Sequence, residues 1–466
     1  GGAPARARHT SVLARLAQEK ATDARIGHLL DALQPYAESL PYDHPEAALV
    51  RVARREYERN IKVPPAFMGQ VYQVGAEAYN TWAKARPENN FAAVQPYLER
   101  ILDNSRKLAD FFPGYEHIAD PLINYADYGM KATSLRQLFT ELRKELVPLV
   151  QQITTLPPAD DSCLHRQFDK AGQLRIGEEL ARLVGYDFER GRLDLTHHPF
   201  TTRFSDGDVR ITTRVNETDL SDCLFSVIHE AGHAMYEQGI RPDFNATPLG
   251  TGTSAGVHES QSRLWENLVG RRLDFWVYAY PRLQAAFPGV LDDISLETFY
   301  RAINKVARSL IRVDADEVTY NLHVMIRFDL ELSLLEGSLA IRDLPEAWHA
   351  RYQSDLGVRA PDDRDGVMQD VHWYAGIIGG VFQGYTLGNI MGAQFFNAAM
   401  QAHPEIPAEM REGKLGTLHR WLIDNIYQYG SSFTASELLQ RVTGGPLSIA
   451  PYMAYLRSKY GALYNL

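Results

Sequence analysis

The stretch Ser226-Val-Ile-His-Glu-Ala-Gly-His-Ala-Met235 carries the most informative pattern of the 466-residue chain. It lies within residues 220–238, where apolar side chains recur at the three- and four-residue spacing of a helix. In such a helix His229 and His233 lie one turn apart on the same face, where their imidazoles can share one metal ion. Glu230 lies beside that ion and not on it, so it is placed to act on a metal-bound water. The stretch therefore predicts a zinc-binding helix.

A zinc site of this kind needs a third protein ligand, and three nearby carboxylates compete for the position. Glu237 continues the same helix and is one turn too far along to complete the site. Glu259 opens a second helix in Gly256-Val-His-Glu-Ser-Gln-Ser-Arg-Leu-Trp-Glu266, and we select it as the third ligand. Glu266, about two turns later, is better placed to accept a hydrogen bond from a zinc-binding histidine.

Outside this region the chain is predicted to be mainly helical. Helical spacing occurs over residues 5–60, 67–84, 90–112, 133–156, 258–278, 296–335 and 371–400. The β signal lies in residues 200–204 and 209–215, which are rich in β-branched and aromatic residues and are joined by the turn Asp206-Gly207-Asp208. We expect one domain over residues 1–466, mainly α with a small β-sheet, in which 1–160 form a helical lid or side lobe and 161–466 the zinc-binding part.

Composition excludes several classes of function. Asp and Glu number 58 against 48 Lys and Arg, and a net charge of −10 disfavours a nucleic-acid partner. The apolar stretch 374–382 is too short to span a bilayer, which takes about 20 residues, so no membrane partner is expected. Cys163 and Cys223 are the only cysteines and form no metal-binding motif, which favours a reducing, cytoplasmic location. The beginning Gly1-Gly2-Ala3-Pro4 lacks an initiator Met, and we expect a truncated start.

The chain resembles the carboxypeptidase Taq family of zinc metallocarboxypeptidases over at least residues 198–388. Six short motifs of that family occur in the family's order: His198-Pro-Phe200, Asp208-Val-Arg-Ile-Thr212, His229-Glu-Ala-Gly-His233, His258-Glu-Ser-Gln261, Ile311-Arg-Val-Asp-Ala-Asp316 and Gly366-Val-Met-Gln-Asp-Val-His-Trp373.

The resemblance implies a set of roles for individual residues. It implies His229, His233 and Glu259 as metal ligands, with Glu230 as general base. Arg312 looks like the residue that receives the terminal carboxylate of the substrate, because a planar guanidinium can hold a carboxylate through two hydrogen bonds.

Further residues are expected around the reacting bond. By analogy with related peptidases, His372 would donate a hydrogen bond to the developing oxyanion, and Tyr385 could supply a second donor. His198 and Arg210 stand in the hairpin region and are expected to position the substrate, and Gln369 is expected to line the same wall.

The family further implies a neurolysin- or angiotensin-converting-enzyme-like two-lobed helical body with a deep active-site groove. It implies hydrolysis of the C-terminal peptide bond of peptide substrates, with broad specificity in which proline is disfavoured, through a zinc-bound water activated by glutamate. Co²⁺ is expected to be able to replace Zn²⁺, and a homodimer is expected.

Two departures from the family pattern and two rival functions remain. Family members carry a further N-terminal segment, and Arg263 stands where many related zinc peptidases have a carboxylate. One rival is an oligopeptidase or dipeptidyl carboxypeptidase of the same architecture, which would not depend on the terminal carboxylate. The other is a peptide-binding protein with a structural zinc, which would need a closed four-ligand site.

Overall fold

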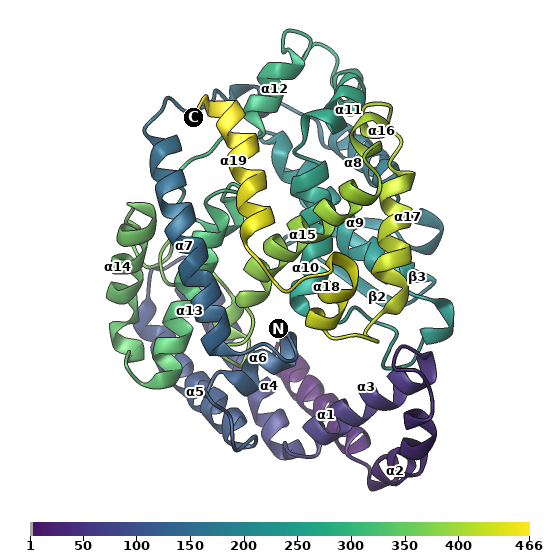
Figure 1. Cartoon of the computed structure of the whole chain (residues 1–466). Helices are drawn as coiled ribbons and strands as arrows, with labels where there is room; N and C mark the ends of the chain where they lie inside the picture. Colours follow the sequence, from purple (N-terminus) through teal and green to yellow (C-terminus); the bar gives the residue numbers. More distant parts are fainter. Residues whose placement is uncertain (1–2) are drawn as a thin grey trace. The chain divides into compact units, whose positions relative to one another are not determined.

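A computed structural model of the chain describes residues 3–466 and confirms a mainly helical fold with a small sheet (Figure 1). The start at Gly1 and Gly2, on which the expectation of a truncated N-terminus depends, lies outside these residues. The chain divides into two compact units: Gly1–Val147 with Arg308–Ala315 and Thr319–Gln383, and Pro148–Ala307 with Asp316–Val318 and Gly384–Leu466. No helix within residues 3–466 combines the length and the apolar character needed to cross a membrane.

The first unit is helical. Its helices are α1 (Ala3–Ala21), α2 (Ala24–Glu38), α3 (Pro45–Asn60), α4 (Pro65–Ala85), α5 (Phe91–Asp110), α6 (Asp120–Ala126), α13 (Tyr320–Glu336) and α14 (Leu344–Leu356), and the boundary with the second unit falls within α7 (Ala132–Thr154). Prolines in the first two positions of α3, α4 and α14 suit helix starts, where a backbone N–H has no partner within the helix.

The second unit contains the sheet and the remaining helices. They are α8 (Lys170–Val184), α9 (Leu220–Gly239), α10 (Ala255–Arg263), α11 (Leu273–Ala286), α12 (Leu296–Ala302), α15 (Gln383–Ala402, from Gly384 on), α16 (Ile406–Arg411), α17 (Gly416–Asn425), α18 (Ala435–Thr443) and α19 (Ala450–Tyr464). A π-helical segment, Leu264–Val269, continues directly from α10.

The small sheet has the strand order β1-β3-β2. The predicted hairpin is present as β2 (Thr201–Ser205) and β3 (Asp208–Thr213), which pair antiparallel. The third strand, β1 (Leu193–Leu195), pairs parallel with β3 and was not predicted, because three residues are too few to show an alternating pattern. Helix α9 packs against both β3 and β2, so the sheet and the metal-site helix form one structure.

Two long predicted helices are wrong in part. The helix expected over 296–335 ends at Ala302, and apart from the 3₁₀ turn Arg312–Asp314 the chain has no helix until α13 begins at Tyr320. The helix expected over 371–400 begins only at Gln383, after the 3₁₀ turn His372–Tyr374 and a loop. That loop contains Gly376, Gly379 and Gly380, all with positive φ angles that side chains with a Cβ rarely adopt.

Candidate metal centre and active site

Helix α9 holds His229 and His233 on one rigid surface. Asp219 caps its start by accepting a hydrogen bond from the backbone N–H of Ser221, and fully buried residues such as Ile228 anchor the helix in the core. The two imidazole rings lie edge to face with their centroids 5.0 Å apart. This spacing leaves both rings on the same side of the helix, as the sequence predicts.

Glycines bring two further helices close to these rings. A Cβ at Gly232 on α9 would lie 2.7 Å from the Gln261 carbonyl oxygen of α10. A Cβ at Gly388 on α15 would lie 2.5 Å from Cγ of Glu259. Distances this short exclude any larger residue without movement of the backbone, so α9, α10 and α15 pack at the closest approach that glycine permits.

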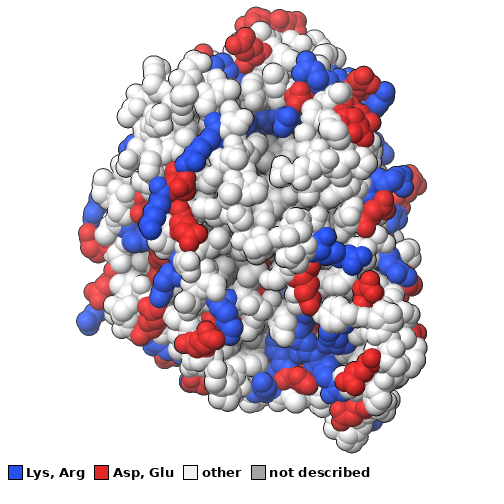
Figure 2. All heavy atoms as spheres, viewed as in Figure 1, with Lys and Arg blue, Asp and Glu red and all other residues white. Residues whose placement is uncertain are grey.

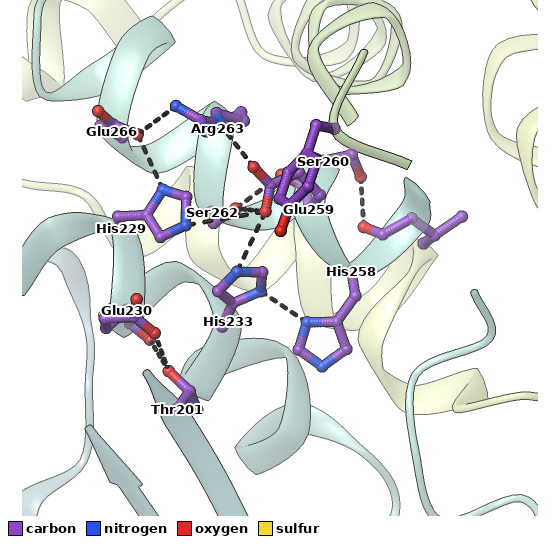
Figure 3. Close-up of polar contacts among 12 residues, drawn as sticks. Thr201, His229, Glu230, His233, His258, Glu259, Ser260, Ser262, Arg263 and Glu266 are labelled. Atoms are coloured by element: carbon purple, nitrogen blue, oxygen red, sulfur yellow. Dashed lines mark hydrogen bonds and ion pairs between the residues drawn. The ribbon is translucent and has the colours of Figure 1, made fainter. Parts of the chain in front are cut away.

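The structure brings His229, His233 and Glu259 together (Figure 3). One ligand atom from each of the three lies within 4.8 Å of the other two. The Oε2 atom of Glu259 is 3.7 Å from Nε2 of His229 and 3.3 Å from Nε2 of His233. Two imidazole nitrogens and one carboxylate oxygen that converge in this way are a donor set that could hold a divalent metal ion.

The far side of His229 is held by Glu266. Nδ1 of His229 lies 2.8 Å from Oε2 of Glu266, which is the contact that the sequence predicts for this carboxylate. An ionised carboxylate only accepts hydrogen bonds, so Nδ1 carries the proton and the Nε2 lone pair faces Glu259. Burial by itself raises the pKa of Glu266, but Arg263 and His229 outweigh that effect and lower the pKa to about 2, which keeps the carboxylate ionised.

The far side of His233 is held by His258 and Glu237, and the sequence did not predict this supporting role for either residue. Nδ1 of His233 lies 2.6 Å from Nδ1 of His258, and Nε2 of His258 lies 2.7 Å from Oε1 of Glu237 (Figure 3 for the histidine pair). Glu237 accepts the Nε2–H of His258, which leaves the His258 Nδ1 lone pair to accept the Nδ1–H of His233. The Nε2 lone pair of His233 is thereby turned toward Glu259. The spacing of four residues between His233 and Glu237 was the available signal.

Glu259 is itself fixed on both carboxylate oxygens. Nε of Arg263 donates to Oε1 at 2.7 Å, and the Ser262 hydroxyl donates to Oε2 at 3.1 Å. Arg263 also donates to Oε2 of Glu266 at 3.1 Å, so one guanidinium links the proposed ligand to the carboxylate behind His229. Burial raises the pKa of Glu259, but Arg263 and His229 outweigh it and hold the pKa well below its ordinary value.

Glu230 is held by the sheet. Glu230 is 6% exposed, and the hydroxyl of Thr201 on β2 donates to Oε2 of Glu230 at 2.6 Å, with the backbone carbonyl oxygen of Glu230 also within reach at 3.0 Å. The carboxylate therefore has one oxygen in a defined hydrogen bond. Thr201 was not singled out from the sequence, although it follows the motif that begins at His198.

The remaining predicted residues of the second unit lie in one connecting segment and on two elements. His198 is exposed in the segment before β2. Arg210 on β3 forms a two-point ion pair with Asp208 on the same strand, at 2.7 and 2.8 Å. Tyr385 is half-buried on α15, three residues before Gly388 and so on the helix face that meets Glu259.

Arg312, Gln369 and His372 belong to the first unit and share a buried cluster. The guanidinium of Arg312 donates to Asp370 through Nε at 3.1 Å and Nη2 at 2.8 Å, and to the hydroxyl of Tyr320 at 2.9 Å. Nε of Arg327 donates to the same carboxylate, to Oδ2 of Asp370, at 2.5 Å.

Gln369 and His372 flank Asp370 in this cluster. The Gln369 carbonyl oxygen accepts the backbone N–H of Arg312 at 3.0 Å and Nη2 of Arg327 at 2.8 Å, so its side chain ties the two arginine segments together. Nδ1 of His372 lies 3.7 Å from Oδ1 of Asp370, and its ring lies 4.8 Å from the ring of Phe382.

Comparison with known proteins assigns almost the whole chain to one family. A family model described as carboxypeptidase Taq (M32) metallopeptidase matches residues 1–460. Thermostable carboxypeptidase 1 of Thermus thermophilus is 42% identical over 99% of this chain and 92% of its own length. Carboxypeptidase 1 of Bacillus subtilis is 36% identical over 96% of this chain and 88% of its own length.

A solved structure of a relative agrees with this assignment. The crystal structure of the M32 carboxypeptidase from Deinococcus radiodurans R1 is 49% identical to this chain and matches it with a TM-score of 0.95, covering 100% of this chain and 93% of the other. The similarity to these relatives agrees with the helical fold. It also agrees with the converging His-His-Glu donor set. The chain belongs to the carboxypeptidase Taq family of metallopeptidases and is a peptide-hydrolysing metallocarboxypeptidase.

Proposed function

We propose that this protein is a zinc carboxypeptidase that removes single residues from the C-termini of peptides, with broad specificity and with proline disfavoured. The observation that carries the proposal is the convergence of His229, His233 and Glu259 within 4.8 Å. Because Glu266 and His258 occupy the far ring nitrogens, both Nε2 lone pairs are presented to the space beside Glu259.

These residues fit a divalent metal in their donor chemistry. Two neutral imidazoles and one carboxylate suit zinc and leave room for a further ligand, and Co²⁺ suits the same donors. When bound there, the metal supplies a Lewis acid that polarises the scissile carbonyl and acidifies water.

Glu230 is proposed as the general base. It takes the proton of the attacking water and later delivers it to the leaving amine. The proposal is supported by its position between the two histidines in sequence, by its burial and by the hydrogen bond from Thr201 to Oε2, which orients the carboxylate without neutralising it.

Arg312 is proposed to receive the C-terminal carboxylate of the substrate. The cluster around it contains the guanidinium groups of Arg312 and Arg327 and the carboxylate of Asp370. Asp370 and Tyr320 fix the orientation of the Arg312 guanidinium, and two cations beside one anion leave that cluster attractive to a further carboxylate.

The other predicted residues keep supporting roles in the proposal. His372 and Tyr385 are proposed as donors to the oxyanion that develops on the scissile carbonyl. His198 and Arg210 are proposed to position the peptide, and Gln369 is proposed to contribute through its hold on the Arg312 backbone. A homodimer and a cytoplasmic location also remain proposals, testable by light scattering and by cell fractionation.

The experiment that tests the function uses one short peptide in two forms, as free acid and as C-terminal amide. Products are followed by mass spectrometry before and after treatment with a chelator, and again after zinc or cobalt is added back. Stepwise loss of single residues from the free acid alone, abolished by chelator and restored by metal, is the expected result. Equal cleavage of the amide would indicate the oligopeptidase alternative and would remove the proposed role of Arg312.

A further inference from the structure

One face of α3 carries a regularly spaced row of cations. Arg51, Arg55 and Arg59 follow one another at intervals of four residues, and Lys62 lies just past the end of the helix. Side chains at this spacing lie on the same side of a helix. Figure 2 shows Lys and Arg side chains gathered in a patch over the region in which Figure 1 labels α1 and α3.

Each of these cations lies over an aromatic ring. The distances from the charged group to the ring centroid are 3.7 Å for Arg51 over Tyr42, 4.4 Å for Arg55 over Tyr128, 4.7 Å for Arg59 over Tyr125 and 5.5 Å for Lys62 over Phe112. The three tyrosines are themselves 38–52% exposed. The rings restrict the rotamers of the long side chains, so part of the entropy cost of binding a ligand is already met.

Two arginines of this row have no acidic partner of their own. Among residues 3–466, neither Arg55 nor Arg59 forms an ion pair or a hydrogen bond with a carboxylate, and Nε of Arg59 is buried without a hydrogen-bond partner. Arg54, on another side of the same helix, is paired with Asp31 at 3.0 Å and lies 3.9 Å from Glu58. Arg54 is thus paired with carboxylates, whereas Arg55 and Arg59 have none among residues 3–466.

The row also has an electrostatic cost. Burial lowers the pKa of Arg55, and the charges of Arg59 and Arg51 lower it further, against the opposing effects of Tyr128 and Glu56. Such a concentration of like charge occurs in a chain whose formal net charge is −10. A bound anion would relieve this repulsion, which is the condition under which a row of guanidinium groups serves as a binding surface.

We propose that the row Arg51, Arg55, Arg59 and Lys62 binds the carboxylate side chains of acidic peptide segments. This inference rests on the proposed peptidase function, because it makes acidic peptides a favoured class of substrate. Guanidinium groups bind carboxylates through paired hydrogen bonds, and exposed tyrosine rings beside them offer apolar contact to the peptide backbone. The acidic net charge of the whole chain disfavours a long polyanion such as a nucleic acid.

The test measures binding separately from cleavage. A fluorescent peptide that contains Asp and Glu, closed by a C-terminal amide, is titrated with the whole protein and followed by anisotropy at low and high salt. The same peptide with Asn and Gln in place of the acids is the ligand control. The double variant Arg55→Gln with Arg59→Gln is compared with Arg54→Gln, which loses one charge from the same helix, and with Arg55→Lys and Arg59→Lys, which retain the charge.

The expected result is that the double Gln variant binds the acidic peptide about tenfold more weakly, while Arg54→Gln binds as wild type and the Lys variants retain part of the affinity. Binding should weaken as salt rises. Helix content and thermal unfolding of each variant show whether it is folded. Equal affinity of wild type and the double variant, or no preference for the acidic peptide over its neutral control, would overturn the proposal.

Two further arms separate the possible failures. A single-stranded DNA oligonucleotide of matched charge that binds more tightly than the acidic peptide would overturn the choice of partner. The ratio of kcat/KM for acidic and neutral free-acid peptides should fall in the double variant. If neither peptide is cleaved by wild type while the binding difference persists, the proposed function fails and the binding surface stands.

Discussion

The two proposed metal-binding histidines have their far nitrogens held by different acceptors. His229 donates to the carboxylate of Glu266, whereas His233 donates to the ring of His258, which donates in turn to Glu237. Each arrangement selects the tautomer with its lone pair on Nε2, but the second needs two correctly placed protons. Because two residues must be in place, substitutions at more positions can change the tautomer of His233 than that of His229.

We expect His258→Phe to lower zinc affinity by about 10- to 100-fold, the range found when such supporting contacts are removed. Phenylalanine preserves a ring beside Tyr236, whose centroid is 5.2 Å from that of His258, but it cannot accept the Nδ1–H of His233. Zinc affinity is measured by competition with a chromophoric chelator. His28→Phe, at an exposed position on α2, is the control, and equal zinc affinity of all three proteins would remove the role given to His258.

Glu230→Gln separates binding of the metal from chemistry. The amide remains able to accept the hydrogen bond of Thr201, but it cannot take a proton from water. We expect unchanged zinc content and a kcat lowered by about 10²- to 10⁴-fold, the usual contribution of a general base. Zinc is measured by atomic absorption and kcat with a free-acid peptide. A variant that keeps zinc and full turnover would show that another group accepts the proton.

At the scale of elements, the site depends on how closely three helices approach. Gly388→Ala would place a Cβ 2.5 Å from Cγ of Glu259, so α15 and α10 must separate. We expect a destabilisation of about 1–3 kcal/mol, as for other overpacked interiors, together with weaker zinc binding because Glu259 moves. Thermal unfolding and chelator competition measure the two effects.

The matched control lies on α19. Gly461 is a helical glycine whose added Cβ would meet nothing within 4 Å, so Gly461→Ala should stabilise the protein by up to about 1 kcal/mol through helix propensity. A destabilised Gly461→Ala would indicate a general sensitivity of the helices to this substitution, and an unchanged Gly388→Ala would show that the helix contact adapts without cost.

The elements around the metal could be predicted from sequence, and those around Arg312 could not. Helix α9 and the β2–β3 hairpin follow local patterns: apolar periodicity in one, and alternation around a turn in the other. The segment 303–319 continues a helical spacing of apolar residues, yet it is extended and irregular. Its backbone is held by side chains distant in sequence, such as Gln369 on the Arg312 N–H, and local propensity carries no record of such contacts.

At the scale of the whole molecule, the division into two units also depends on contacts that local sequence patterns do not record. Residues 308–315 and 319–383 join the unit formed by 1–147, whereas 316–318 join the other unit. The resemblance to a known family supplied the fold class and the residues to examine, but it did not reveal His258, Glu237 or Thr201 as supports of the site. These contacts depend on side-chain directions that only the folded chain determines.

A buried carboxyl group makes the stability of the whole molecule depend on pH. Glu331 on α13 is 2% exposed, and the indole N–H of Trp373 donates to its Oε1 at 2.9 Å. Burial raises its pKa from 4.5 to about 7, against the opposing effects of Trp373 and the Gly379 backbone. The folded protein then holds a proton that the unfolded chain releases above the ordinary pKa. This contribution to stability is complete below about pH 4.5 and is lost as the pH rises through about 7.

Glu331→Gln keeps an acceptor for Trp373 and cannot ionise. Its stability relative to wild type should therefore increase as the pH rises. The two should be similarly stable near pH 5, and the variant should be more stable by up to about 3 kcal/mol near pH 8. Calorimetric unfolding at both pH values measures the difference.

Glu336→Gln on the same helix is the control of opposite sign. Despite the partial burial of Glu336, contacts with Arg136 and His117 lower its pKa. Its replacement should therefore cost more stability near neutral pH than in acid. A stability difference between Glu331→Gln and wild type that does not change with pH would mean that Glu331 titrates alike in the folded and unfolded chain.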